Sequence, residues 1–325
     1  METVGRMAGV SQVTVSRALS DPSKVSPETL ARIREAIAAT GFVPNALAGA
    51  LASQKSMLVS ALVPSITNIV YAGMLATFSA EMRARGYQIL LSETGFDAED
   101  EAATVEAHLS RRPDAILLTG VHHAPRTRRM LLGAGVPVVE VWDITDTPID
   151  LCVGFSHPAA GRAMADFALQ AGYGAAAGIT AGDERARRRL GAFAEHFSQG
   201  RGGTPVPIVA TGAASLASGR ALLAELIDRH GFAGGVIACS SDVLAHAVLI
   251  EAAARGLSVP GDLAVIGFGD QDLAAAVEPA LTTVRVNREA LGRAGANAVL
   301  TRIQGGEPPE RVIDIGFSLI RRASA

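Results

Sequence analysis

The sequence is poor in cysteine, in aromatic residues and in excess charge of either sign. It has two cysteines and one tryptophan in 325 residues, and aromatic residues make up only 4%. Cys152 and Cys239 lie far apart in apolar runs, which excludes a disulfide framework and predicts two small buried hydrophobic residues. The hydrophobic content of 49% is ample for a large core, which aliphatic side chains must fill.

Long hydrophobic runs are also absent. No apolar stretch is long enough to span a bilayer, and the first residues, METVGRMAG, lack the basic and apolar regions of a secretory signal. We therefore expect a cytoplasmic protein without membrane contacts. The net charge of -3 excludes a protein that coats nucleic acid with a basic surface. Residues 1–57 nevertheless carry six basic against four acidic residues, so they hold +2 and the remainder holds -5.

The residue pattern changes near Leu58 and divides the chain in two. Residues 1–57 read as helical, whereas from Leu58 onward short apolar runs alternate with helical stretches, which is typical of βαβ units and parallel sheets. Roughly ten strands are too many for one ordinary sheet, so we expect two α/β lobes. The predicted domains are a helical head (1–44), a hinge helix and linker (45–57), and a two-lobed body (58–325). Within the body, the N-lobe would hold about 58–153 and 286–315, and the C-lobe about 154–285 and 316–325, with 143–154 as the first crossover.

Capping residues mark the helices of the head. Ser11 is a natural N-cap for a second helix, and Ser26 followed by Pro27 opens a third, which Gly41 ends. On the second helix, Val15, Ala18 and Leu19 share one face and are expected to pack on Val4, Met7, Leu30, Ile33 and Ile37.

The opposite face of the second helix carries Gln12, Val13, Ser16 and Arg17. A helix-turn-helix protein places such a face in the major groove of DNA, where an arginine can donate two hydrogen bonds to a guanine. A small helical cap with a solvated polar face fits the same spacing equally well, so the spacing alone leaves both possibilities open.

The stretch GVSQVTVSRALSDPSKVSPETLARIREAIAATGFVPNALAGAL resembles the N-terminal region of the lactose/galactose-repressor family of bacterial transcription factors. The α/β body continues the resemblance, which implies a two-lobed core like that of the periplasmic binding proteins. The resemblance implies that Gln12, Val13 and Arg17 read base edges and that Ser11, Thr14 and Ser16 contact phosphates. It also implies that Asn45 opens a hinge helix and that Leu51 enters the minor groove as an apolar wedge.

Polar and aromatic residues follow several strands of the body, where small ligands bind in α/β proteins. Trp142 and Asp143 suit a sugar or polyol, and Arg185 and Arg189 suit a carboxylate or phosphate. Each of these residues could instead be an ordinary helix cap or part of a solvated helix face. The complete candidate set for an effector site is Tyr71, Trp142, Asp143, Arg185, Arg189, Ser241, Asp242 and Asp270.

The finer resemblance is to gluconate-operon repressors, through stretches such as VPSITNIVYAGML and VEVWDITDTPIDLCVGFSHPAAGRAMA. It implies gluconate or a similar sugar acid, with or without a phosphate, as the effector. The resemblance predicts an allosteric repressor that binds a pseudo-palindromic operator in double-stranded DNA as a homodimer or tetramer.

Two other classes of function share parts of this pattern. A sugar-binding protein with the same core and no DNA regulation is the main alternative, which the helical head disfavours. An enzyme is not expected, because no G-x-G-x-x-G after a strand, P-loop or G-x-S-x-G elbow is present. His122 and His123 lack further metal ligands at suitable spacing, so we expect a solvated loop there, with no metal and no cofactor.

Overall fold

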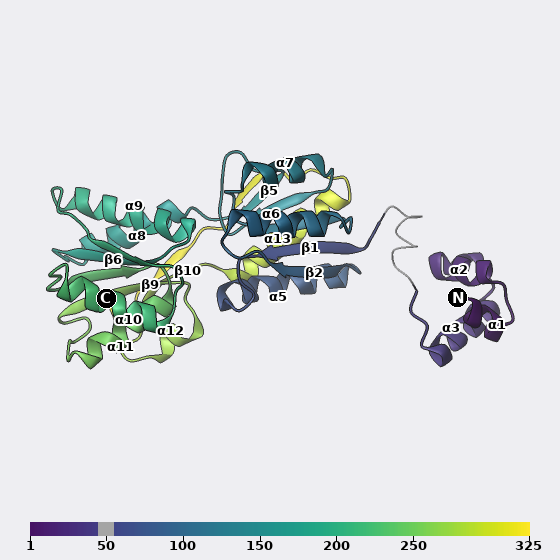
Figure 1. The fold of residues 1–325 in the computed structure, drawn as a ribbon, viewed down its shortest axis with the longest axis horizontal. Coiled ribbons are helices and arrows are strands. Elements are labelled where there is room, and N and C mark those ends of the chain that lie inside the picture. Colours follow the sequence, from purple (N-terminus) through teal and green to yellow (C-terminus); the bar gives the residue numbers. More distant parts are fainter. Residues whose placement is uncertain (45–54) are drawn as a thin grey trace. The chain divides into compact units, whose positions relative to one another are not determined.

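The computed structural model describes residues 1–44 and 55–325 of the chain (Figure 1). These form two compact units, one of Met1–Leu58 with Arg112–Asp114 and the other of Val59–Arg111 with Ala115–Ala325. We call residues 1–44 the head and the second unit the core, and each is described by itself.

The head consists of three α-helices and one short 3-10 helix, and the predicted caps are confirmed. The Ser11 hydroxyl accepts a hydrogen bond from Thr14 N at 3.2 Å, and Ser26 caps the third helix in the same way. Gly41 ends that helix in the left-handed conformation, with φ of 62°. The elements are α1 (Glu2–Ala8), α2 (Gln12–Ser20), η1 (Pro22–Lys24) and α3 (Pro27–Thr40).

The head buries fewer hydrophobic side chains than the sequence predicts. Met7 and Leu19 were expected to be buried, but 55% and 37% of their surface is exposed. The helix α1 also closely approaches the turn that follows it, since a Cβ atom on Gly5 would lie 2.8 Å from the carbonyl oxygen of Val10. The packing uses short side chains instead, and the buried residues are Val4, Ala8, Val15, Ala18, Ile33 and Ala36.

The core holds two sheets, which confirms the two predicted α/β lobes, and each sheet has six strands, where roughly ten were expected in all. The first has the order β11-β5-β4-β3-β1-β2, and the pairs β1–β3, β3–β4, β4–β5 and β5–β11 are parallel. Its strands are β1 (Leu58–Val63), β2 (Gln88–Glu93), β3 (Ala115–Thr119), β4 (Val138–Val141), β5 (Leu151–Gly154) and β11 (Val312–Asp314).

The second sheet has the order β12-β10-β9-β8-β6-β7. Its strands pair in parallel except at β12, which runs antiparallel to β10 and so makes this sheet mixed. The strands are β6 (Ala176–Ala181), β7 (Ile208–Thr211), β8 (Gly235–Cys239), β9 (Leu263–Phe268), β10 (Thr282–Arg285) and β12 (Ser318–Ile320).

Helices cover both faces of each sheet (Figure 1). In the first lobe α5 packs on α13 and α6 on α7, and in the second lobe α8 packs on α9 and α10 on α11. The helices are α5 (Ile69–Ala84), α6 (Ala98–Leu109), α7 (Pro125–Gly133), α8 (His157–Gln170), α9 (Glu184–Gly200), α10 (Leu216–Asp228), α11 (Asp242–Ala254), α12 (Asp272–Ala276) and α13 (Arg288–Ile303). No helix in the described part of the chain is long and apolar enough to cross a membrane.

The chain passes between the two sheets three times, after Gly154, after Arg285 and after Asp314. The expectation of a first crossover over residues 143–154 is therefore wrong, because residues 151–154 form β5 and pair with β4 in the first sheet. The turn formers that suggested a crossover make the loop between β4 and β5. Cys152 and Cys239 are free and buried in their strands, as predicted.

Candidate functional site

The exposed face of α2 is the first candidate surface. Val15 and Ala18 are buried against the rest of the head, whereas Gln12, Ser16 and Arg17 are exposed, and Val13 is 67% exposed. This separation follows from the helical period, which places these two sets on opposite sides. The first two turns of α2 therefore present an amide, an apolar group and a guanidinium to solvent.

The hydroxyl groups at the start of α2 are partly used within the head. Ser11 Oγ lies 2.9 Å from Thr14 Oγ1 and also caps the helix, so both side chains are held in place at its N-terminus. An ordered hydroxyl pair at a helix N-terminus suits a phosphate oxygen. Asn45 and Leu51, the two residues predicted for a hinge helix, lie outside the described residues.

The second candidate surface is a cleft in the core at the carboxyl ends of β1, β2 and β3. A cavity of about 210 Å³ lies there, which is smaller than the roughly 300–1,000 Å³ of drug-sized ligand pockets and limits the site to a small molecule. One wall is formed by the residues that follow these strands, including Thr94, Phe96 and Gly120, and the other by the start of α9 from Gly182 to Arg187. The cavity thus lies between the two lobes of the core.

Tyr71, Trp142 and Arg185 come together beside this cleft. The Tyr71 and Trp142 rings meet edge to face with centroids 5.5 Å apart, and Arg185 Nη2 donates to the Tyr71 hydroxyl at 2.9 Å. Burial raises the pKa of Tyr71, so its hydroxyl stays neutral. Trp142 Nε1 is a buried donor with no hydrogen-bond partner among the described residues.

Trp142 also has a strained backbone, with φ of 72°. The conformation brings the backbone of Asp143 directly over Gly154, where a Cβ atom would collide with the Asp143 carbonyl. The glycine in β5 therefore permits the turn that directs Trp142 and Asp143 away from the end of β4.

Arg189 is the most buried of the arginines on α9, with 4% of its surface exposed. It donates to His157 Nδ1 and to the Ser240 carbonyl, both at 2.6 Å, and its guanidinium lies 3.6 Å from the centroid of the Phe268 ring. Burial lowers its pKa to about 10, so it remains charged at neutral pH. Burial and then Arg189 hold the pKa of His157 well below 6.5, and the neutral ring donates through Nε2 to the Trp142 carbonyl at 2.9 Å.

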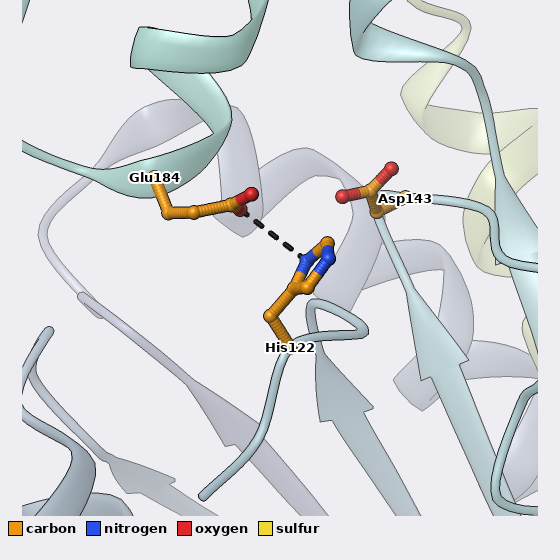
Figure 2. A group of neighbouring side chains, drawn as sticks. All are labelled: His122, Asp143 and Glu184. Carbon is orange, nitrogen blue, oxygen red and sulfur yellow. Dashed lines mark ion pairs between the residues drawn. The ribbon is translucent and has the colours of Figure 1, made fainter.

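Asp143 is fully buried and pairs with a residue that the sequence analysis did not select. Its Oδ2 lies 2.6 Å from Arg188 Nη1, and Arg188 Nε lies 3.3 Å from Glu184. His122 reaches the same place from the loop after β3, with Nδ1 3.4 Å from Glu184 (Figure 2). The cluster therefore joins the two lobes.

The donor set of His122, Asp143 and Glu184 is close enough in space to hold a metal ion, because the ligand atoms lie within 4.8 Å of one another (Figure 2). The Arg188 guanidinium already pairs with both carboxylates, however, and supplies the positive charge at this point. The cluster is better described as an ion-pair network than as a metal centre.

The other predicted effector residues are engaged within the protein. Asp242 is buried and accepts hydrogen bonds from Thr283 Oγ1 at 2.6 Å and Gln271 N at 2.7 Å, while Ser241 caps α11. Burial raises the pKa of Asp242. These bonds tie the start of α11 to neighbouring segments.

Asp270 follows β9 and faces arginines instead of the cavity. Its carboxylate pairs with Arg285 and, at 2.7 Å, with Arg322. Burial opposes the ionisation of Asp270, but the two arginines outweigh it and lower its pKa. Arg285 ends β10 and Arg322 follows β12, so this network joins the ends of three strands of the second sheet.

His123 corrects the expectation of a solvated loop. His122 is exposed, but only 1% of the His123 side chain is. Its Nδ1 lies 3.0 Å from Glu101 and its Nε2 3.2 Å from Glu140. Burial works against the charge of His123, but the two carboxylates outweigh it and raise the pKa to about 9. Glu101 and Glu140 lie 22 and 17 residues from His123 in the sequence, so no local sequence pattern predicts the cluster.

Comparison with known proteins identifies the family. The pattern described as bacterial regulatory proteins, lacI family, matches residues 1–45, and that of a periplasmic binding protein-like domain matches residues 165–325. The chain is 34% identical to the HTH-type transcriptional regulator GntR of Pseudomonas aeruginosa over 326 residues, covering 100% of this chain and 95% of that protein. The chain belongs to the lacI family. A regulator of the same name from Escherichia coli K12 is 33% identical and covers 98% of this lacI-family chain and 96% of its own.

Solved structures agree with this assignment. A lacI-family regulator from Silicibacter pomeroyi has a TM-score of 0.92 at 30% identity, covering 99% of this chain and 98% of its own. The regulator GntR from Chromobacterium violaceum has a TM-score of 0.77 at 33% identity and covers 82% and 98%. The lacI-family chain is thus a DNA-binding transcriptional regulator. The match at its head disfavours the alternative of a sugar-binding protein without DNA regulation.

Proposed function

We propose that the chain is a repressor of a sugar-acid utilisation operon and that a small sugar acid bound in the cleft controls its affinity for DNA. The observation that carries the proposal is the state of two arginines on α9, of which Arg185 lines the cavity and Arg189, one turn further along the helix, is buried. Among the described residues, the hydrogen-bond partners of Arg185 and Arg189 are all uncharged: a phenol, a neutral imidazole and a backbone carbonyl. Their positive charges are not cancelled by a directly bonded carboxylate, so an anionic ligand is favoured there.

Two aromatic residues beside Arg185 suit the hydroxyl groups of such a ligand. Trp142 offers an unpartnered indole N–H and an apolar ring, and Tyr71 offers a phenol oxygen. We propose that these two side chains and the two arginines contact the effector, and that Asp143, which is buried and bonded to Arg188, acts on it through its charge. Ser241, Asp242 and Asp270 would act by positioning the loops around it, because their side chains bond to the protein itself. The resemblance of the sequence to gluconate-operon repressors makes gluconate or its phosphorylated form the first candidate.

For DNA, we propose that Gln12, Val13 and Arg17 read base edges and that Ser11, Thr14 and Ser16 contact phosphates. Asn45 and Leu51 would belong to a hinge at residues 45–57, between a DNA-binding domain (1–44) and an effector and dimerisation domain (58–325). The charge of +2 on residues 1–57 supplies little affinity by itself, because phosphate neutralisation dominates DNA binding. Two heads on a pseudo-palindromic operator, and hence a homodimer in the cytoplasm, supply more contacts. We propose no catalytic activity.

A thermal-shift screen tests the effector. Gluconate and 6-phosphogluconate are added to the full-length protein, with glucitol as the neutral polyol of the same chain length. A ligand at about 100 times its Kd adds roughly 2.7 kcal/mol to the free energy of unfolding, so one of the two acids is expected to raise the Tm clearly above the effect of glucitol. An equal effect of glucitol, or no effect of either acid, contradicts the proposed effector class.

A further inference from the structure

Asp143 is a buried carboxylate whose charge depends on one side chain from the opposite lobe. None of its surface is exposed, and its Oδ1 accepts a hydrogen bond from the next backbone N–H, of Ile144, at 2.9 Å. Its Oδ2 accepts from Arg188 Nη1 at 2.6 Å. A buried charge that loses its partner is strongly destabilised, so Arg188 is the group that makes an ionised Asp143 tolerable at this position.

The second acid of the cluster depends on Arg188 much less. Glu184 pairs with Arg188 Nε at 3.3 Å, but 47% of its side chain is exposed and water can solvate it. His122 lies 3.5 Å from Arg188 Nη1 and is 57% exposed. Asp143, in contrast, has no contact with solvent, and Arg188 is its only ion-pair partner among residues 1–44 and 55–325.

The charge of Asp143 also acts on the arginines that would hold an acid. Asp143 and the helix-capping Asp183 both act electrostatically on Arg189, and Asp183 Oδ1 is bonded to Ala186 N at 2.9 Å. While Arg188 pairs with Asp143, the positive charges of Arg185 and Arg189 are left for a ligand. Without Arg188, the charge of Asp143 would have to be balanced by the nearby Arg185 and Arg189, and these two would then attract an anion less in a poorly screened site.

We propose that Arg188 sets the preference of the cleft for anionic over neutral ligands by neutralising Asp143. It is a specificity-determining residue that acts through Asp143 instead of through contact with the ligand. The assignment deepens the proposed function and rests on it, since a sugar acid must be the effector for this preference to matter.

A double-mutant cycle tests the assignment on the full-length protein. Dissociation constants for gluconate and glucitol are measured by calorimetry for the wild type, R188L, D143N and the double variant R188L/D143N. In the presence of Asp143, R188L is expected to weaken gluconate binding roughly 10- to 100-fold, as one uncompensated unit charge a few ångströms away would. In the D143N background the same change is expected to cost less than about threefold. The affinity for glucitol should change little in either background.

Two controls separate charge from structure. R188K keeps the positive charge and is expected to retain the preference for gluconate. R229L removes an exposed arginine at the C-terminal end of α10 and is expected to change nothing. If R188L fails to fold, the comparison of D143N with R188L/D143N and the R188K variant still decide the question.

The outcomes separate the two proposals. Wild-type binding of gluconate that R188L leaves unchanged, or an equal loss in both backgrounds, overturns the role of Arg188 and leaves the effector class standing. If the wild type binds neither probe, or binds glucitol as well as gluconate, the proposed effector fails and the role of Arg188 with it.

Discussion

At the scale of single residues, the same side-chain types have different roles because their partners differ. Arg185, Arg188 and Arg189 follow one another closely on α9, yet one bonds to a phenol, one to carboxylates and one to a neutral imidazole and a carbonyl. The run of arginines in the sequence does not distinguish them. Only their partners separate the residue that pairs with an acid from the two whose hydrogen-bond partners are uncharged.

The exposed arginine of α2 gives a prediction at this scale. Arg17→Ala is expected to lower affinity for a duplex selected by the wild-type protein from a random-sequence pool by about 1–3 kcal/mol, because one bidentate base contact is lost. Affinity for unselected duplexes should fall much less. Gel shifts at fixed salt measure both, and Arg34→Ala, at another exposed arginine, on α3, is the control. Equal losses for the two variants would refute the reading role of Arg17.

At the scale of elements, α9 carries Arg185, Arg188 and Arg189. The position of this helix is fixed by its close contact with α8. Gly161 on α8 lies so near the Arg189 backbone that a Cβ atom there would overlap the carbonyl oxygen of Arg189. The contact explains how a helix of the C-lobe holds three guanidinium groups at the boundary with the N-lobe.

A pair of glycine substitutions tests this contact. Gly161→Ala is expected to destabilise the protein by about 1–3 kcal/mol through overpacking and to weaken gluconate binding, because α9 must move. Gly191→Ala changes an open position on α9 itself, with no atom within 4 Å of the added methyl group, and should stabilise the helix by up to about 1 kcal/mol. Denaturant unfolding and ligand titration of both variants measure these effects. If Gly161→Ala changed neither the free energy of unfolding nor the affinity for gluconate, the packing of α8 on α9 would not position the site.

Prediction from sequence succeeded for local features of these elements and failed for long-range ones. Ser11, Ser26 and Gly41 were identified as caps because the signal for a helix end lies within a few residues. The loop after Trp142 was taken for a crossover, since turn formers say nothing about which sheet the next strand joins. Arg188 was missed because its partner, Asp143, lies 45 residues away and the pairing depends on how two lobes meet.

At the scale of the whole molecule, buried histidines whose pKa values are shifted in opposite directions limit the pH range in which the protein is stable. Burial lowers the pKa values of His108, His157 and His246. The unfolded chain therefore binds more protons than the folded one, and stability falls as the pH drops below about 6.5. His123 acts in the other direction, because its folded pKa of about 9 lies above the unfolded value of 6.5.

The stabilisation from His123 is thus fully present below about pH 6.5 and is lost as the pH rises through 9. Wild-type protein is expected to lose about 2–3 kcal/mol of its free energy of unfolding over this range through this group. His123→Gln should be less stable at pH 6.5 and should show a much flatter dependence from there to pH 9.5. Urea unfolding at a series of pH values measures both curves, and parallel curves would exclude His123 as the source.

The three passages between the sheets also govern the order in which this protein can fold during synthesis. Residues 1–44 form a contiguous helical head that can pack as soon as it leaves the ribosome. Neither lobe of the core can be completed so early. The first sheet includes β11 at Val312–Asp314 and the second includes β12 at Ser318–Ile320, and both strands are synthesised near the end of the chain. Ser324, whose hydroxyl donates to the Val265 carbonyl at 2.7 Å, joins the C-lobe later still. A nascent chain can thus fold its DNA-binding head well before the cleft forms. Both lobes are completed almost at the same time, by the last residues of the chain.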